Sequence, residues 1–158
     1  MLERDQRRLV DRIKIPHRAE GLAITPDGET LFVCAHERPE LHVIDARSLR
    51  LRRTVAIAGG EGRANQLKRV RVSPDGRHVL VSSLIDNHVA FFETAGLRQI
   101  GSLATAKAPM GFGFAPDGKQ AYVCCHDDAL VMHFELETGR EIGRFQTAAG
   151  CEFLIAYR

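Results

Sequence analysis

A four-residue motif occurs three times in the chain and constrains its fold more than any other feature. It reads Thr25-Pro26-Asp27-Gly28, then Ser73-Pro74-Asp75-Gly76, then Ala115-Pro116-Asp117-Gly118, and its prolines are 48 and 42 residues apart. Proline fixes φ at the first corner of a turn, aspartate accepts local backbone hydrogen bonds, and glycine adopts the positive φ at which a strand reverses. Each motif therefore predicts a hairpin turn, and the chain is predicted to be a repeat array.

Apolar residues alternate with a period of two on both sides of each turn, which is typical of half-buried β-strands. In the first repeat, Leu22 and Ile24 precede the turn, and Leu31 and Val33 follow it. Each repeat then continues with two more predicted strands, the third at 41–44, 89–92 and 131–134 and the fourth at 54–57, 99–103 and 141–145. Four antiparallel strands within about 40–45 residues are the pattern of one β-propeller blade.

The strand after each turn also resembles a known family. It reads Leu31-Phe32-Val33-Cys34, Val79-Leu80-Val81-Ser82 and Ala121-Tyr122-Val123-Cys124, and the segments His42-Val43-Ile44-Asp45 and Thr138-Gly139 follow in their expected places. This pattern is similar to that of YVTN-repeat β-propellers, which are lactonase-like and WD40-like. The resemblance covers nearly the whole chain and implies the fold. It does not select an activity, because the group contains hydrolases, dehydrogenase subunits, surface-layer proteins and binding proteins.

The predicted fold class is all-β, a β-propeller built of four-stranded antiparallel blades, with three full blades and partial blades at both ends. We assign residues 1–18 to the end of a preceding blade, 19–65, 66–108 and 109–150 to three blades, and 151–158 to the inner strand of a next or shared blade. Within the first segment, Leu2 and Glu3 align with a third strand, and residues 10–13 align with an edge strand. A charged N-terminal helix over residues 2–12 is the alternative.

Three blades do not close a ring, because propellers typically use four to eight. Three arrangements therefore remain open. The chain is the C-terminal part of a longer, seven-bladed protein, or it associates with itself, or its two end strands share a fourth blade. The expected partners are the remainder of a longer propeller or a second copy, together with a protein or small-molecule ligand.

Composition and charge exclude two other classes of partner. The net charge is only +2, the basic residues are scattered, and aromatic residues make up only 6% of the chain, so we expect no nucleic-acid ligand. We also expect no membrane span, because no stretch approaches the roughly 18 apolar residues that a spanning helix needs. The family resemblance suggests a periplasmic or cell-surface location, but residues 1–5 do not read as a signal peptide, and the compartment stays open.

The candidate site lies on one face of the predicted propeller. Loops before each inner strand and loops between the second and third strands emerge together around the channel mouth, where titratable residues are concentrated. The alternative is that loops are polar on any protein surface. The predicted ligand-binding residues are His17, Arg18, Glu20, His36, Glu37, Arg63, Asn65, Lys107, His126 and Asp127.

One of these loops, at residues 59–69, is longer than its counterparts. With Arg63, Lys68 and Arg69 it is either a basic lid over the channel mouth or a tolerated insertion.

The sequence predicts neither a metal site nor a cofactor. His36 and His126 occupy equivalent positions in blades that are not adjacent, whereas a metal needs three or four converging ligands. No cysteine pair has the spacing of a zinc motif. Cys34 and Cys124 share the repeat position of Ser82 and are expected to fill the core, whereas Cys151 should lie near the channel mouth.

Two functions remain, and no catalytic residue can be assigned from spacing. The first is a non-catalytic module that binds a protein, polymer or small ligand through its loop face. The alternative is a lactonase-like hydrolase or a dehydrogenase-associated propeller subunit with a site at the channel mouth, for which the family resemblance points to Glu20, His36, Asn65 and Asp127.

Overall fold

Three four-stranded antiparallel sheets make up most of the computed structural model, which describes residues 2–3, 8–9, 11–59 and 66–152. The first sheet contains β3 (Ala19–Ile24), β4 (Thr30–Ala35), β5 (Glu40–Asp45) and β6 (Arg50–Ala56). The second contains β7 (Leu67–Val72), β8 (His78–Ser83), β9 (His88–Glu93) and β10 (Gln99–Ala104), and the third β11 (Pro109–Phe114), β12 (Gln120–Cys125), β13 (Leu130–Glu135) and β14 (Glu141–Gln146). The predicted all-β class is confirmed.

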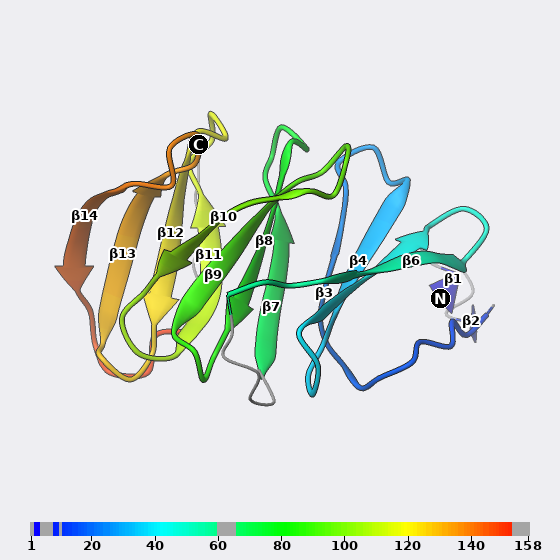
Figure 1. Ribbon diagram of the computed structural model, residues 1–158, viewed down its shortest axis with the longest axis horizontal. Helices are drawn as coiled ribbons and strands as arrows, with labels where there is room; N and C mark the ends of the chain where they lie inside the picture. Colours follow the sequence, from blue (N-terminus) through cyan, green and yellow to red (C-terminus); the bar gives the residue numbers. More distant parts are fainter. Residues whose placement is uncertain (1, 4–7, 10, 60–65, 153–158) are drawn as a thin grey trace.

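The sheets follow one another as propeller blades. In each sheet the strands pair in chain order, and the three sheets stand side by side from β3–β6 at the right of Figure 1 to β11–β14 at the left. Neighbouring blades meet closely along their inner strands β3 and β7. The arrangement is a partial β-propeller, as the repeat predicted.

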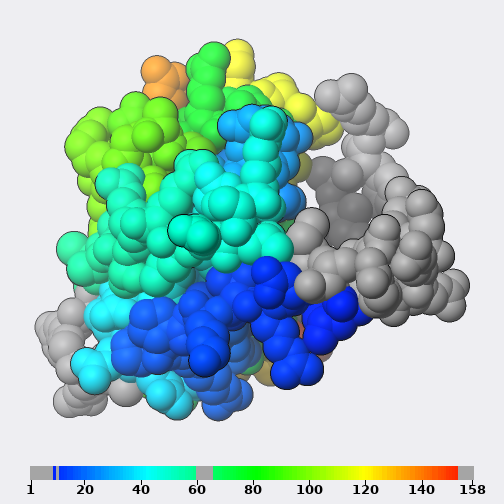
Figure 2. All heavy atoms as spheres, turned by 90° about the vertical axis from the view of Figure 1, so that its right-hand side faces the viewer, coloured from blue at the N-terminus to red at the C-terminus, as the bar shows by residue number. Residues whose placement is uncertain are grey.

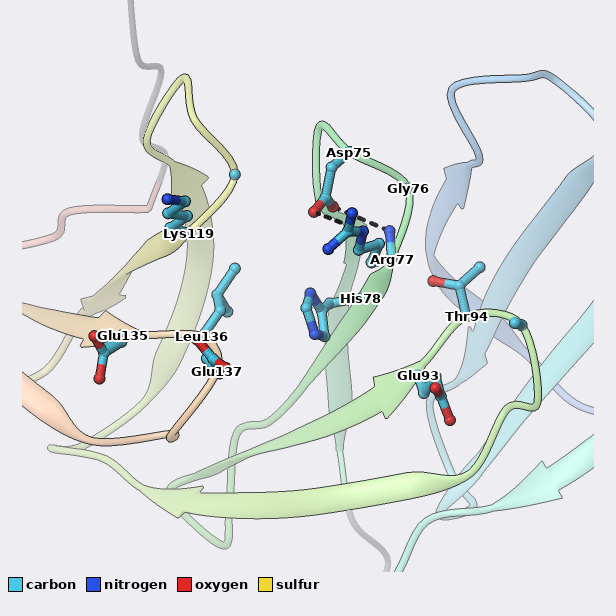
Figure 3. A pocket seen from close by; sticks show the side chains of 12 residues that line it. Asp75, Gly76, Arg77, His78, Glu93, Thr94, Lys119, Glu135, Leu136 and Glu137 are labelled. Atoms are coloured by element: carbon cyan, nitrogen blue, oxygen red, sulfur yellow. Dashed lines mark hydrogen bonds and ion pairs between the residues drawn. The ribbon is translucent and has the colours of Figure 1, made fainter.

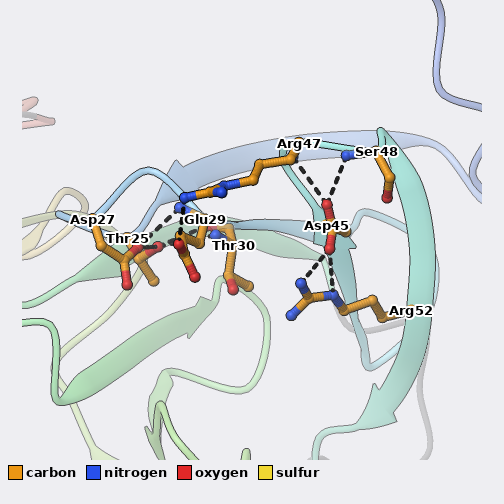
Figure 4. Close-up of polar contacts among 8 residues, drawn as sticks. All are labelled: Thr25, Asp27, Glu29, Thr30, Asp45, Arg47, Ser48 and Arg52. Atoms are coloured by element: carbon orange, nitrogen blue, oxygen red, sulfur yellow. Dashed lines mark hydrogen bonds and ion pairs between the residues drawn. The ribbon is translucent and has the colours of Figure 1, made fainter.

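The three repeated motifs form the predicted hairpin turns. Their glycines have positive φ, at 74° for Gly28, 73° for Gly76 and 69° for Gly118, which the absence of a Cβ permits without strain. The aspartate then caps the turn, and Oδ1 of Asp27 accepts a hydrogen bond from the backbone N–H of Glu29 at 2.9 Å (Figure 4). These contacts explain why each motif reverses the chain between the first two strands of a blade.

Side chains from adjacent blades interlock to form two cores. Between the first and second blades, Phe32 and Leu41 of one sheet pack with Val79 and Phe92 of the other. Between the second and third, the corresponding partners include Leu80, Phe91, Val123 and Phe134. Alternate residues of a strand point to opposite faces, so the second blade contributes to both cores. This two-sided burial is why the middle strands read as continuous apolar runs.

The inner strand of the first blade departs from the expected burial. Leu22 is 68% exposed and Ile24 is 53% exposed, although both belong to the apolar alternation. Val70 and Phe112, the repeat equivalents of Leu22, are only 2% and 3% exposed, because a preceding sheet covers each of them. No four-stranded sheet precedes β3 in the described part of the chain. Figure 2 looks onto this side of the molecule, with residues 11–18 in dark blue and the first blade in blue to cyan.

The N-terminal residues form a short hairpin instead of the predicted edge strand at 10–13. Strand β1 (Leu2–Glu3) pairs antiparallel with β2 (Arg8–Leu9), with Leu2 opposite Leu9. The return strand therefore lies at 8–9, earlier than expected, and residues 11–15 have no regular structure. At the other end, residues 153–158 of the predicted inner strand lie outside the described residues. The described part of the chain contains no helix long and apolar enough to span a membrane.

Candidate functional site

Two classes of loop meet at the same end of every blade, which we call the loop face. In each blade the residue after the second strand donates a backbone hydrogen bond to the loop before the inner strand. The bonds run from His36 to the carbonyl of Arg18, from Leu84 to that of Gln66, and from His126 to that of Ala108, all at 2.9 Å. The repeated bond places the side chains of both loops beside one another around the inner strands.

A cluster of charged side chains joins the first two blades on this face. Glu20 of β3 accepts a hydrogen bond from Nζ of Lys68 of β7 at 2.6 Å through Oε1. Its other oxygen, Oε2, lies 3.4 Å from Nδ1 of His36 and 3.8 Å from Arg18. The Glu20 side chain is only 15% exposed. We call these four residues the Glu20 cluster.

The close approach of two backbones positions this cluster. A Cβ on Gly21 would lie 2.9 Å from the carbonyl oxygen of Lys68 and 3.0 Å from Cα of Arg69, so only glycine fits between β3 and β7. Lys68 and Arg69 therefore belong to a strand that packs on β3, and the expectation that they form part of a lid is wrong. The signal for Lys68 in the sequence was its repeat position, which is that of Glu20.

Electrostatics keep the centre of the cluster charged. The hydrogen bond from Lys68 lowers the pKa of Glu20, and partial burial of the carboxyl opposes this effect only in part. Nearby charges on Lys68, His36 and Arg18 act in the same direction as the hydrogen bond. The cluster thus presents an ionised carboxylate beside the ammonium of Lys68 and the guanidinium of Arg18, and only Arg18 is largely exposed, at 64% of its side chain. Such fixed charges can orient a polar or charged ligand, but none of the four is a nucleophile activated by a base.

A second group of predicted residues lines a hollow of about 580 Å³ between the second and third blades. Lys107, His126 and Asp127 lie in its wall together with Asn87 and Glu152. Nδ1 of His126 is 2.9 Å from Oδ1 of Asp127, and its Nε2 is 4.0 Å from Glu152. The amide of Asn87 fixes the rim by accepting a hydrogen bond from the N–H of Ala108 at 2.9 Å. We call this the His126 hollow.

Two of the described predicted residues, His17 and Glu37, belong to neither group. His17 stacks on the buried His42, with ring centroids 6.3 Å apart, and lies 3.5 Å from the carboxylate of Glu40. Glu37 is exposed. Arg63 and Asn65 lie outside the described residues. Six of the ten predicted residues therefore fall in two places one blade apart, with Arg18, Glu20 and His36 in the first and Lys107, His126 and Asp127 in the second.

The cysteines and acids offer no metal centre in the described part of the chain, where no three His, Cys, Asp or Glu side chains converge on one point. Cys34, Cys124 and Cys125 are fully buried, and burial raises the pKa of the Cys34 thiol to about 11 and those of Cys124 and Cys125 to about 12. These thiols are protonated at neutral pH and fill the core. Cys151 is partly exposed beside β13.

Comparison with protein families identifies one match. The family described as "Lactonase, 7-bladed beta-propeller" matches residues 21–150, which is most of the chain. No curated protein matches the sequence.

Solved structures similar to this chain belong to diverse proteins. Kuenenia stuttgartiensis hydrazine synthase superposes with a TM-score of 0.78 at 22% identity, over 91% of this chain and 40% of the other. The RRP9 WD40 repeats give a TM-score of 0.79 at 16% identity, over 90% and 43%. The β-propeller domain of Myceliophteria thermophila Cps50 (Swd1) gives 0.73 at 15%, over 88% and 44%. At these identities the likeness shows the fold alone, and the chain spans less than half the length of each.

Proposed function

The chain belongs to the family described as "Lactonase, 7-bladed beta-propeller", and we propose that within this family it serves as a non-catalytic propeller module that binds its ligand through the loop face. The observation that carries the proposal is the Glu20 cluster. Its carboxylate and the ammonium of Lys68 come from the inner strands of adjacent blades, where a propeller surrounds its channel. Paired, partly buried charges at such an opening are typical of a site that orients a polar ligand.

The partner that completes the ring is the second part of the proposal. Leu22 and Ile24 leave an apolar strip on the first blade, whereas the residues at the same repeat positions are buried or half-buried in the next two. A blade supplied by the remainder of a longer propeller, or by a second copy of this chain, would bury that strip. Light scattering of the purified chain separates the two cases, because a discrete dimer supports self-association and a monomer supports a longer parent protein.

The ligand proposal is tested by a binding screen on the loop face. Small carboxylic acids, sugar lactones and short peptides are added to the purified chain, and binding is detected by the shift in the temperature of unfolding. A true ligand of the loop face loses at least tenfold in affinity in Glu20→Gln and Lys68→Met. Arg47→Gln is the matched control, because it removes a charged side chain from the opposite face and should leave the affinity unchanged. A ligand that binds Glu20→Gln and Lys68→Met as tightly as it binds Arg47→Gln would contradict the proposal.

A second candidate function, a lactonase-like hydrolase, is favoured by the family match and by the His126–Asp127 pair. A histidine 2.9 Å from a carboxylate, with its other nitrogen beside a hollow, has the arrangement of a general base that activates water. Hydrolysis of a panel of sugar lactones tests this function. Turnover that disappears in both His126→Gln and Asp127→Asn supports the enzyme, and its absence in an assembled full ring excludes it.

A further inference from the structure

A groove of about 650 Å³ separates the second and third blades on the end of the molecule opposite the loop face. Its walls come from the turns that join the first and second strands and the third and fourth strands of both blades. Figure 3 shows the turn from Asp75 to His78 at the centre, with Lys119, Glu135 and Glu137 on one side and Glu93 and Thr94 on the other. We call it the turn-face groove, and none of the predicted site residues lies in it.

A comparison with the first blade explains why the groove is open. There, the side chain of Arg47 reaches from the turn between the third and fourth strands to the turn between the first and second. Its Nη2 donates a hydrogen bond to Oε1 of Glu29 at 2.7 Å (Figure 4). At the same repeat positions, the second blade has Ala95 in place of Arg47 and Arg77 in place of Glu29. Alanine is too short to cross between the two turns of the second blade, so the space that an ion pair bridges between the turns of the first blade stays open there and forms one side of the groove.

The charges around the groove favour a cation. Four carboxylates line it, on Asp75, Glu93, Glu135 and Glu137, against the two cations Arg77 and Lys119, which leaves an excess of two negative charges. Of the four, Glu137 is exposed and makes no ion pair within the described part of the chain. Opposite charge within a partly enclosed space raises the local concentration of a positively charged ligand.

The groove also has an apolar wall and unused hydrogen-bonding capacity. Leu136, only 2% exposed, lies in the wall between Glu135 and Glu137. Nδ1 of His78 and Oγ1 of Thr94 are buried in the same walls and have no hydrogen-bond partner among the residues that the structure describes. A buried polar atom left unpaired costs about 1–3 kcal/mol, so a polar group that reaches these atoms after a small side-chain rotation is favoured.

We propose that the turn-face groove is a second binding site, which takes the basic side chain of a lysine or arginine in an extended peptide. The aliphatic stem lies against Leu136, and the charged end approaches the carboxylate of Glu137. The site is independent of the proposed function of the loop face, because it lies at the other end of the blades and uses none of the same residues.

The test is a titration of the isotope-labelled chain with blocked tripeptides, followed by amide NMR. The peptide Gly-Arg-Gly should shift the resonances of residues 75–78, 93–95 and 135–137, whereas Gly-Glu-Gly should leave them unchanged. Ala95→Arg restores a long side chain and adds a positive charge inside the groove, and we expect at least a tenfold loss of affinity for the arginine peptide. Glu137→Gln removes one negative charge and should weaken binding at least threefold.

Ser48→Arg is the matched control, because it adds the same charge on the equivalent turn of the first blade, outside the groove. It should not change the affinity. Ala95 and Ser48 are both exposed, so neither replacement disturbs the core. Equal binding of the glutamate peptide, or full affinity in Ala95→Arg and Glu137→Gln, would overturn the proposal.

Discussion

The first and second blades have the same strands and the same turns, but they differ in what covers their inner strands. Leu22 of the first blade is 68% exposed, whereas Val70, its repeat equivalent in the second, is 2% exposed. Both are aliphatic and both alternate with polar or small residues. The difference teaches that the burial of an inner-strand side chain depends on the neighbouring blade, since each repeat can bury its apolar face only against a neighbour.

The largest predicted effect comes from truncating the same repeat position in two blades. Phe112→Ala should lower the free energy of unfolding by about 3–5 kcal/mol, because it opens a cavity between the second and third blades. Leu22→Ala should change it by less than about 0.5 kcal/mol, because the side chain is exposed. Urea denaturation of the 158-residue chain measures both. A large loss in Leu22→Ala would break the comparison, because it would mean that a partner already covers the first blade in solution.

The pH dependence of stability compares two buried histidines, His42 of the first blade and His88 of the second. Burial lowers the pKa of His88, whose two ring nitrogens have no hydrogen-bond partner within the described ranges, so the folded chain holds it neutral. In the unfolded chain the same imidazole takes up a proton at the ordinary histidine pKa of about 6.5. Stability should therefore be full above that pH and fall as the pH decreases toward the lowered folded pKa, at no more than about 1.4 kcal/mol per pH unit for this residue.

His88→Leu, which copies Leu130 of the third blade, should remove this part of the slope. His42, fully buried in the first blade, also has a pKa that burial lowers, and Nδ1 of its ring is 2.9 Å from Oγ1 of Thr54. His42→Met, which copies Met132 of the third blade, should also remove part of the slope. An unchanged slope in His88→Leu would show that its ring is not held neutral in the folded chain.

The smallest predicted effect concerns the hydroxyl at the head of each turn. Oγ of Ser73 donates to Asp75 at 2.6 Å and accepts from the N–H of His78 at 3.0 Å, and Thr25 makes the same pair of contacts in the first blade. The third blade has Ala115 there. Ser73→Ala should cost about 1 kcal/mol, and Ala115→Ser should gain no more than about 1 kcal/mol. Thermal melts of the two variants measure both changes in stability. If both variants unfold at the same temperature as the original chain, the role given to the hydroxyl is contradicted.

Much of the fold could be predicted because its signals are local. The Pro-Asp-Gly turns, the alternation around them and the order of four strands all depend on residues close in sequence. The candidate site was predicted less completely. The loops were assigned to one face, but the contact between Glu20 and Lys68 joins residues 48 positions apart, and its geometry depends on the close approach at Gly21.

The sequence by itself determined the repeat, the strands and the turns, because each is encoded by backbone preference and periodicity within a few residues. Only the tertiary structure decided which apolar residues are covered, which charges meet across two blades, and where a groove stays open. The physical reason is that these features depend on side chains of neighbouring blades. Whether Leu22 is buried, or whether Ala95 leaves a space, depends on which side chains face it from the neighbouring elements.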